Sequence, residues 1–125
     1  MGAKHRPMIV MVDDEPGYLS LLSKWLARDY DLRLFSSGEG VYEALEELKP
    51  DLVLLDVNMQ PMDGLELCRR IRTDARFDLT SVLFLTAAKS DEDFTRQIEA
   101  GASGFLNKPI EREELRRVIA EELAV

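Results

Sequence analysis

The sequence predicts a single α/β domain in which helices cover both faces of a doubly wound, five-stranded parallel sheet. Short apolar runs without polar alternation are typical of strands covered on both faces, and here they alternate with segments of helical periodicity. Strands joined by helices in this way pair in parallel through right-handed crossovers. The chain has 125 residues, of which 46% are hydrophobic, so it has room for one core and no second domain.

Five segments are predicted strands, and four of them are uninterrupted apolar runs. These four are residues 8–12, 52–55, 82–85 and 105–106. The fifth, residues 32–35, contains Arg33 within its apolar run. A charged side chain at that position indicates an edge of the sheet rather than its centre.

The first three predicted helices are recognised by their start and stop signals. Pro16 suits a first helical turn, and the apolar face that follows it extends to about Asp29. Residues 37–40 open the second helix, which Pro50 stops. Asp63 is placed to cap the third helix.

The last two predicted helices follow the fourth and fifth strands. Ser90, with Asp93 three residues later, forms an acidic version of the capping box. Phe94 and Ile98 form the apolar stripe of this fourth helix, and Gly101 ends it. The fifth helix carries apolar residues at helical spacing, namely Leu115, Val118, Ile119 and Leu123.

Charge and composition exclude several classes of protein. The net charge of −8 argues against a chain that holds nucleic acid or an anionic membrane by its own field, and favours a basic partner or a cation. Cys68 is the only cysteine, so no internal disulfide can form. The first apolar run is too short for a signal peptide or a membrane span. We expect a flexible tail at residues 1–7, the folded domain at residues 8–125, and a cytoplasmic protein.

Four of the apolar runs end in residues that phosphoryl chemistry can use. These residues are Asp13 and Asp14 after the first run, Asp56 after the second, Thr86 after the third and Lys108 after the last. Singly, most of them have ordinary explanations as helix caps or surface residues, although a carboxylate directly after four apolar residues is costly to bury. Ligands of parallel sheets bind at the carboxyl ends of the strands. The pattern therefore predicts one pocket that contains carboxylates, a hydroxyl and an ammonium group.

Five motifs surround these residues in order and cover nearly the whole chain. They are VDDEP at 12–16, LLDVNM at 54–59, MDGLEL at 62–67, LTA at 85–87 and GASGFLNKP at 101–109. Together they closely resemble the receiver domain of two-component response regulators. The resemblance implies a flavodoxin-like sheet with strand order 2-1-3-4-5. It also implies a cis peptide bond between Lys108 and Pro109.

The resemblance assigns a role to each site residue. Asp56 would be the phosphoryl acceptor, attacking the phosphohistidine of a histidine kinase or a histidine phosphotransfer protein. Asp14, Asp56 and the backbone carbonyl of Asn58 would hold Mg²⁺ or Mn²⁺, with Asp13 acting through a metal-bound water or as an outer ligand. Thr86 would donate its hydroxyl to a phosphoryl oxygen, and Lys108 would pair first with Asp56 and then with the phosphate. Such chemistry is mostly positioning and charge stabilisation, and hard oxygen donors suit Mg²⁺.

The resemblance also implies a regulatory switch rather than a turnover enzyme. Thr86 would move toward the phosphate, and Phe105 would respond by changing its rotamer. The fourth helix, fifth strand and fifth helix would form the output face, through which a partner, an attached effector domain or a second copy could bind. Its expected exposed contacts are Asp91, Glu92, Arg96, Glu99, Glu111, Arg112 and Arg116. A stand-alone regulator and the receiver part of a longer one are both compatible with the sequence, as are a monomer and a phosphorylation-dependent dimer.

One position departs from the family, and three other classes fit the sequence less well. The family usually has proline four residues after the acceptor, whereas Gln60 stands there and Pro61 follows it. A phosphohydrolase of the aspartyl-phosphate type commonly has a second acid where this chain has Asn58, and no cap domain fits. A binding module that had lost phosphorylation would lack some of the site residues. A flavin carrier would need a phosphate-binding loop where this chain has acidic residues.

Overall fold

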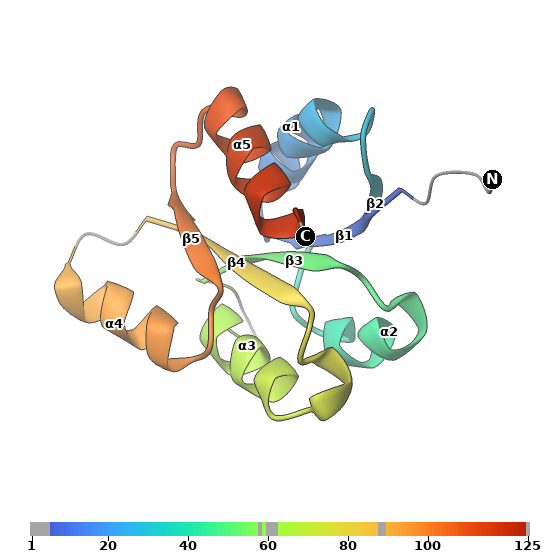
Figure 1. Cartoon of the computed structure of the whole chain (residues 1–125). Helices are drawn as coiled ribbons and strands as arrows, with labels where there is room; N and C mark the ends of the chain where they lie inside the picture. The colour runs from blue at the N-terminus through green and yellow to red at the C-terminus, as the bar shows by residue number, and fades with distance from the viewer. Residues whose placement is uncertain (1–5, 58, 60–62, 88–89, 125) are drawn as a thin grey trace.

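A computed structural model describes residues 6–57, 59, 63–87 and 90–124. Five parallel strands form one sheet in the order β2-β1-β3-β4-β5, as the sequence implies (Figure 1). The strands are β1 (Met8–Val12), β2 (Asp31–Phe35), β3 (Leu52–Asp56), β4 (Ser81–Thr86) and β5 (Gly104–Asn107). Asp56 and Thr86 are the last residues of their strands, so the predicted site residues lie where the sheet ends.

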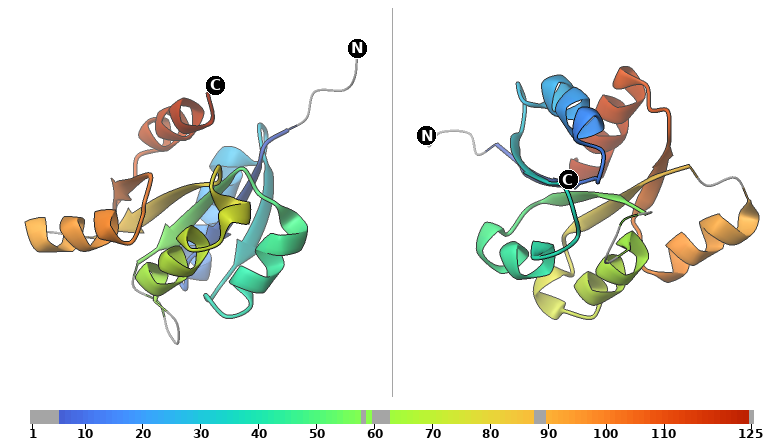
Figure 2. Two further views of the ribbon diagram at one scale, coloured as in Figure 1. Left: turned by 60° about the horizontal axis from the view of Figure 1, so that its bottom comes forward. Right: turned by 180° about the vertical axis from the view of Figure 1, so that it is seen from behind.

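Helices cover both faces of this sheet. They are α1 (Pro16–Leu26), α2 (Val41–Leu48), α3 (Gly64–Arg72), α4 (Asp91–Glu99) and α5 (Arg112–Leu123), with a short 3₁₀ helix, η1 (Ala75–Phe77), before β4. Helices α1 and α5 lie on one face, and α2 and α3 lie on the other (Figures 1 and 2). Helix α4 lies on the same face as α2 and α3, beside the edge strand β5. The predicted doubly wound α/β fold is therefore confirmed.

The core consists of two apolar layers, one on each side of the sheet, because successive strand residues point to opposite faces. Val53 and Leu55 of β3 belong to the layer under α2 and α3, whereas Leu52 and Leu54 belong to the layer under α1 and α5. All residues of β3 are buried, but three of the five residues of β2 are exposed. The prediction that the strand with Arg33 forms an edge is thus confirmed.

Local capping signals were reliable guides to the starts of two helices. Asp63 caps α3 by accepting a hydrogen bond from the Glu66 backbone N–H at 2.8 Å. Ser90 caps α4 by accepting one from the Asp93 N–H at 3.2 Å. Helix α1 ends at Leu26, earlier than the expected Asp29, because the chain turns there and the Leu26 carbonyl accepts the N–H of Asp29.

The predicted apolar stripe of α4 is wrong in one residue. Ile98 is 61% exposed, whereas the neighbouring Gln97 is 2% exposed and is the buried residue of the helix. Phe94, the other member of the predicted stripe, is partly buried. Residues three and four positions after Phe94 both share its side of a helix, so apolar periodicity alone could not decide which of them turns toward the sheet.

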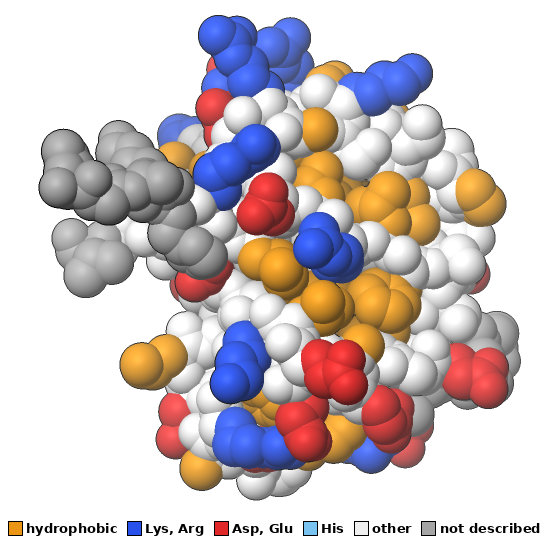
Figure 3. All heavy atoms as spheres, turned by 90° about the vertical axis from the view of Figure 1, so that its right-hand side faces the viewer, with side chains coloured by type: hydrophobic (Ala, Val, Ile, Leu, Met, Phe, Trp, Pro, Cys, Tyr) orange, Lys and Arg blue, Asp and Glu red, His pale blue; other side chains and the backbone are white. Residues whose placement is uncertain are grey.

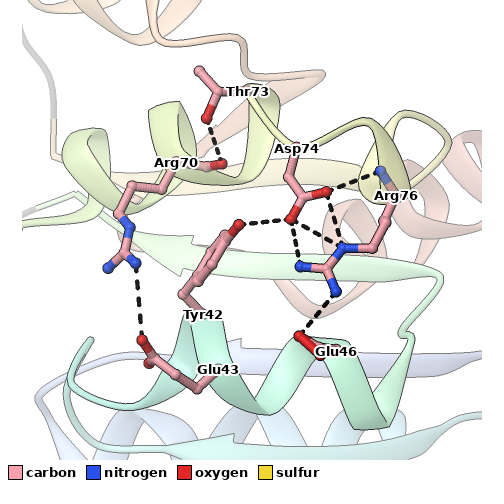
Figure 4. Close-up of polar contacts among 7 residues, drawn as sticks. All are labelled: Tyr42, Glu43, Glu46, Arg70, Thr73, Asp74 and Arg76. Carbon is pink, nitrogen blue, oxygen red and sulfur yellow. Dashed lines mark hydrogen bonds and ion pairs between the residues drawn. The ribbon is translucent and has the colours of Figure 1, made fainter.

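A cluster of polar side chains connects α2 to η1 on the side of the molecule away from α1 and α5. We call Tyr42, Glu46, Asp74 and Arg76 the α2–η1 network (Figure 4). The Tyr42 hydroxyl donates to Asp74 at 2.6 Å, and Arg76 Nη2 donates to the same carboxylate oxygen at 2.7 Å. Arg76 also pairs with Glu46 at 2.8 Å. Each acidic group of the network therefore has a cationic or hydroxyl partner.

The surface near β2 and α2 is partly apolar. Figure 3 shows hydrophobic side chains gathered in the middle of this face with charged side chains around them. The exposed edge strand contributes to the apolar surface of the protein, since Leu34 is 45% exposed. Within the described part of the chain, none of the helices has the length and apolar content needed to cross a bilayer.

Candidate functional site

The carboxyl edge of the sheet brings four of the predicted site residues together. Asp13 follows β1, Asp56 ends β3, Thr86 ends β4 and Lys108 follows β5. The Lys108 ammonium lies 2.9 Å from Asp13 Oδ2 and 3.7 Å from Asp56 Oδ1. The geometry therefore places one ammonium between two carboxylates that the sequence separates by 43 residues.

These charged groups are mostly removed from water. The side chains of Asp13, Asp56 and Lys108 are 0%, 8% and 18% exposed. Buried carboxylates require partners, because desolvation disfavours their charged form. Glu15 adds a third carboxylate at 3.5 Å from Lys108 Nζ, although its side chain is 68% exposed. In the described part of the site, one lysine thus faces three acidic groups, and a bound cation would reduce the repulsion among them.

The surroundings of Lys108 hold it in this position. Its backbone N–H donates to the Thr86 carbonyl at 2.8 Å, and the peptide bond to Pro109 is cis, as predicted. The Tyr18 ring lies 4.8 Å from Lys108 Nζ, and the Tyr18 hydroxyl accepts the Ile110 backbone N–H at 3.2 Å. Burial lowers the pKa of the Lys108 ammonium, but the hydrogen bond to Asp13 and the nearby carboxylates outweigh burial, so the pKa is raised above its ordinary value.

The acidic residues after β1 offer oxygen ligands to a cation. One carboxylate oxygen each from Asp13, Asp14 and Glu15 can be chosen so that all three lie within 4.8 Å of one another. Asp13 is buried, whereas Asp14 and Glu15 are exposed, so the group lies at the mouth of the site. Hard oxygen donors with open positions toward solvent suit Mg²⁺, which keeps several of its waters. Asn58, the remaining predicted ligand, lies outside the described residues, as does the Gln60–Pro61 departure from the family.

Glycine at position 64 allows α3 to start directly against the end of β3. The Gly64 N–H donates to the Val57 carbonyl at 2.9 Å. A Cβ at this position would overlap the backbone carbonyl oxygen of Asp56. Gly64 is not among the site residues predicted from the sequence. The Asp63–Gly64 pair, which is a common turn signal, was the only indication available in the sequence.

Thr86 and Phe105 both contact helix α4. The Thr86 hydroxyl oxygen accepts a hydrogen bond from Gln97 Nε2 at 3.0 Å, and both residues are 2% exposed. The Phe105 ring lies 4.7 Å from the Phe94 ring, centroid to centroid, with an interplanar angle of 31°. Gln97 is not among the residues predicted from the sequence, because a glutamine beside an apolar stripe gives no signal of burial.

Comparison with known proteins identifies the family. Residues 9–120 match the sequence profile of the response regulator receiver domain. The chain belongs to this family. It is 31% identical over 118 residues to the response regulator Rre1 of Synechocystis, an alignment that covers 93% of this chain and 51% of that protein. It is 33% identical over 111 residues to the DNA-binding response regulator MtrA of Mycolicibacterium smegmatis, covering 88% of this chain and 47% of the relative.

A solved structure supports the same assignment. The receiver domain superimposes with a TM-score of 0.91 on a protein from Chloroflexus aurantiacus J-10-fl that is described as a response regulator. The two are 30% identical, and the superposition covers 97% of this chain and 100% of the other. The receiver domain spans about half the length of the two sequence relatives. It is a regulatory domain of two-component signalling, with the flavodoxin-like fold of its family.

Proposed function

We propose that this receiver domain is a phosphoacceptor switch in which Asp56 receives a phosphoryl group. The donor is the phosphohistidine of a histidine kinase or of a histidine phosphotransfer protein. The observation that carries the proposal is the Asp56 carboxylate itself, which lies at the end of a buried strand with an ammonium group 3.7 Å away. A buried acid with a cation beside it and further acids around it is suited to phosphoryl transfer more than to stabilising the fold.

The proposed transfer forms one bond and breaks one. An Asp56 carboxylate oxygen attacks phosphorus, the phosphorus–nitrogen bond of the phosphohistidine breaks, and the electron pair leaves with the imidazole nitrogen. Thr86 donates its hydroxyl to a phosphoryl oxygen. The Lys108 ammonium remains hydrogen-bonded to Asp13 at 2.9 Å and exchanges only its weaker contact, with Asp56, for the phosphate. The positive charge therefore stays in the site during the whole reaction.

The acidic residues suit a divalent cation, Mg²⁺ or Mn²⁺, as the cofactor. We assign Asp14, Asp56 and the Asn58 backbone carbonyl as ligands, with Asp13 as an outer ligand or acting through a water. When bound, such a cation neutralises the oxygens of the transferred group. Asp13 is already bonded to Lys108 and to the Glu15 N–H, which supports its outer role. Exposed Asp14 is free to turn toward an incoming ion.

The proposed output is a change in the face formed by α4, β5 and α5. Phe105 and Thr86 are the switch residues, and both contact α4. Six of the seven expected surface contacts are exposed, but Arg116 is only partly so and pairs with Asp29 after α1 at 3.3 Å. We therefore exclude Arg116 from the proposed face. The domain would act in the cytoplasm, as a monomer or a phosphorylation-dependent dimer, through an output partner or an attached effector domain. We propose no nucleic-acid or membrane binding by the domain itself, and no turnover activity.

Intact-mass measurement tests the central claim. The protein is incubated with a small phosphodonor, with and without Mg²⁺, as wild type, Asp56→Asn and Asp78→Asn. Asp78 is an exposed acid after η1 that precedes the start of β4, whereas Thr86 lies at the other end of that strand, so its variant is a matched control. We expect one added phosphoryl group on wild type and on Asp78→Asn, only with Mg²⁺, and none on Asp56→Asn. Equal labelling of all three proteins would rule out Asp56 as the acceptor.

A further inference from the structure

Helix α4 buries a polar residue where an apolar one was available. Gln97 is 2% exposed, whereas the adjacent Ile98 is 61% exposed. Burying an amide is unfavourable unless its hydrogen bonds are restored. The helix would gain more burial free energy by presenting Ile98 to the sheet. Hydrophobic burial alone therefore does not explain why Gln97 and not Ile98 faces the sheet, and the hydrogen bond of the Gln97 amide does.

The amide has one hydrogen bond to a described residue, and that bond is to the site. Gln97 Nε2 donates to Thr86 Oγ1 at 3.0 Å. Within the described residues, the other amide atom of Gln97, Oε1, is buried without a hydrogen-bond partner. The direction of the bond matters, because Gln97 is its donor and Thr86 its acceptor. The bond therefore uses the oxygen of the Thr86 hydroxyl and not its proton, which is the part of the group that the proposed function assigns to a phosphoryl oxygen on Asp56.

A second contact on the same side of α4 reaches the other switch residue. Phe94 lies three positions before Gln97, so the two side chains share one side of the helix. Its ring packs on Phe105 of β5 with centroids 4.7 Å apart. Helix α4 thus touches Thr86 through an amide and Phe105 through an aromatic ring. Figure 1 shows that the helix otherwise extends away from the body of the molecule beside β5.

We propose that Gln97 is a positioning residue that holds the Thr86 hydroxyl and transmits its displacement to α4. This inference rests on the proposed phosphorylation of Asp56. When Thr86 moves toward the phosphoryl group, the Gln97 amide either follows it or loses its bond, and α4 is reseated in both cases. A pocket of about 230 Å³, lined by Thr86, Arg96 and Gln97 among others, gives the amide room to move. Phe94 then carries the change to Phe105.

The expected coupling is modest in size and works in both directions. A neutral hydrogen bond changes an equilibrium by about fivefold, which is the scale of the bias that Gln97 can transmit. Because coupling is reciprocal, a change at α4 must also alter the position of the Thr86 hydroxyl. A partner that binds α4 would therefore change how readily Thr86 contacts the phosphate.

The test replaces the amide with an apolar group of similar length. Gln97→Met removes the hydrogen bond and the unpartnered oxygen together, so we expect an unchanged or higher melting temperature. Ile98→Met is the matched control on the exposed side of the same helix. Each protein is labelled to completion with a small phosphodonor and Mg²⁺, verified by intact mass, and its backbone amide NMR shifts are compared with those of the unlabelled form.

We expect the phosphorylation-induced shifts across α4 to fall by about half or more in Gln97→Met, and to be unchanged in Ile98→Met. The shifts at the end of β4 should persist in both. Thr86→Val should lose the α4 response too, and the double variant Thr86→Val, Gln97→Met should lose no more than either single variant. A purely structural role of Gln97 would not produce this non-additivity.

The outcomes separate the inference from the function on which it rests. If labelled Gln97→Met keeps the full α4 response, the inference is wrong and the phosphoacceptor function stands. Additive losses in the double variant also overturn it, because Gln97 and Thr86 would then act independently. If wild type cannot be labelled at all, the proposed function is wrong, and this inference, which rests on it, is wrong too.

Discussion

Two clusters of charged side chains in this protein differ in how completely they are neutralised. In the α2–η1 network, Asp74 accepts hydrogen bonds from Tyr42 and Arg76, and Arg76 also pairs with Glu46 (Figure 4). At the carboxyl edge of the sheet, Lys108 is the cation that pairs with Asp13, Glu15 and Asp56 among the residues that the structure describes. Among the described residues, the network has two carboxylates for one guanidinium, whereas the site has three carboxylates, two of them buried, for one ammonium.

The difference indicates what each cluster does. The hydrogen bonds from Arg76 and Tyr42 lower the pKa of Asp74 below its ordinary value, and the bond to Asp74 raises the pKa of Tyr42. Such a cluster connects α2 to η1 through contacts between its own side chains. Like charges that are buried together destabilise a fold unless a ligand neutralises them. The site is therefore the part of the molecule whose stability should depend on what is bound.

The largest expected effect comes from the backbone contact that supports the site. In Gly64→Ala the new methyl group would overlap the Asp56 carbonyl, so α3 or β3 must shift. We expect a loss of about 1–3 kcal/mol in the free energy of unfolding, measured with urea, as for other overpacked positions. Gly17→Ala is the matched control, because nothing lies within 4 Å of a Cβ there. Equal stability of the two variants would contradict this prediction, because it would show that an added methyl group at position 64 costs no more than one at the open position 17.

Metal binding should stabilise the site and leave the network unaffected. With Mg²⁺ at a hundredfold excess over its dissociation constant, wild type should gain about 2.7 kcal/mol and melt at a higher temperature. Asp14→Ala should lose most of this gain, whereas Asp74→Asn should keep it. Melting by circular dichroism across a Mg²⁺ titration measures all three proteins. If Asp14→Ala responds as wild type does, Asp14 is not a ligand.

Acid should affect the network in a predictable direction. A carboxyl group with a lowered folded pKa contributes stability above its unfolded pKa, and loses that contribution as the pH falls through the folded value. Asp74 should therefore stabilise the protein at pH 7 and stop doing so at strongly acidic pH. Urea unfolding at a series of pH values should show Asp74→Asn less stable than wild type at pH 7, with the two curves converging in acid. Parallel curves would mean that Asp74 has no such role.

The smallest expected effects come from two tyrosine hydroxyls, that of Tyr18 beside Lys108 and that of Tyr42 in the α2–η1 network. Tyr18→Phe removes the acceptor of the Ile110 N–H, with an expected loss of about 1 kcal/mol. It should also slow labelling of Asp56, because Tyr18 supports the segment that positions Lys108. Tyr42→Phe removes the bond to Asp74 and should lower stability without changing the labelling rate. Unfolding and phosphodonor kinetics on both variants check this, and a slowed Tyr42→Phe would contradict the separation of the two clusters.

Local and periodic signals in the sequence were sufficient for the fold class and for the outline of the site. Apolar runs located the strands, and the residues directly after or at their ends had to meet, because parallel strands share one carboxyl edge. Asp63 and Ser90 were recognisable as caps since capping depends on residues only a few positions apart. The family resemblance added the strand order and the cis bond before Pro109, and both are present.

Contacts between distant segments were decided only by the tertiary structure. The sequence could place Lys108 near both acids, but not closer to Asp13 than to Asp56. It grouped Ile98 with Phe94 by periodicity, and only packing against β4 turned Gln97 toward Thr86 instead. The overlap that requires glycine at position 64 depends on where α3 meets the end of β3. Sequence patterns report which side of an element is apolar, whereas the identity of a polar partner depends on distances that exist only after the elements have packed together.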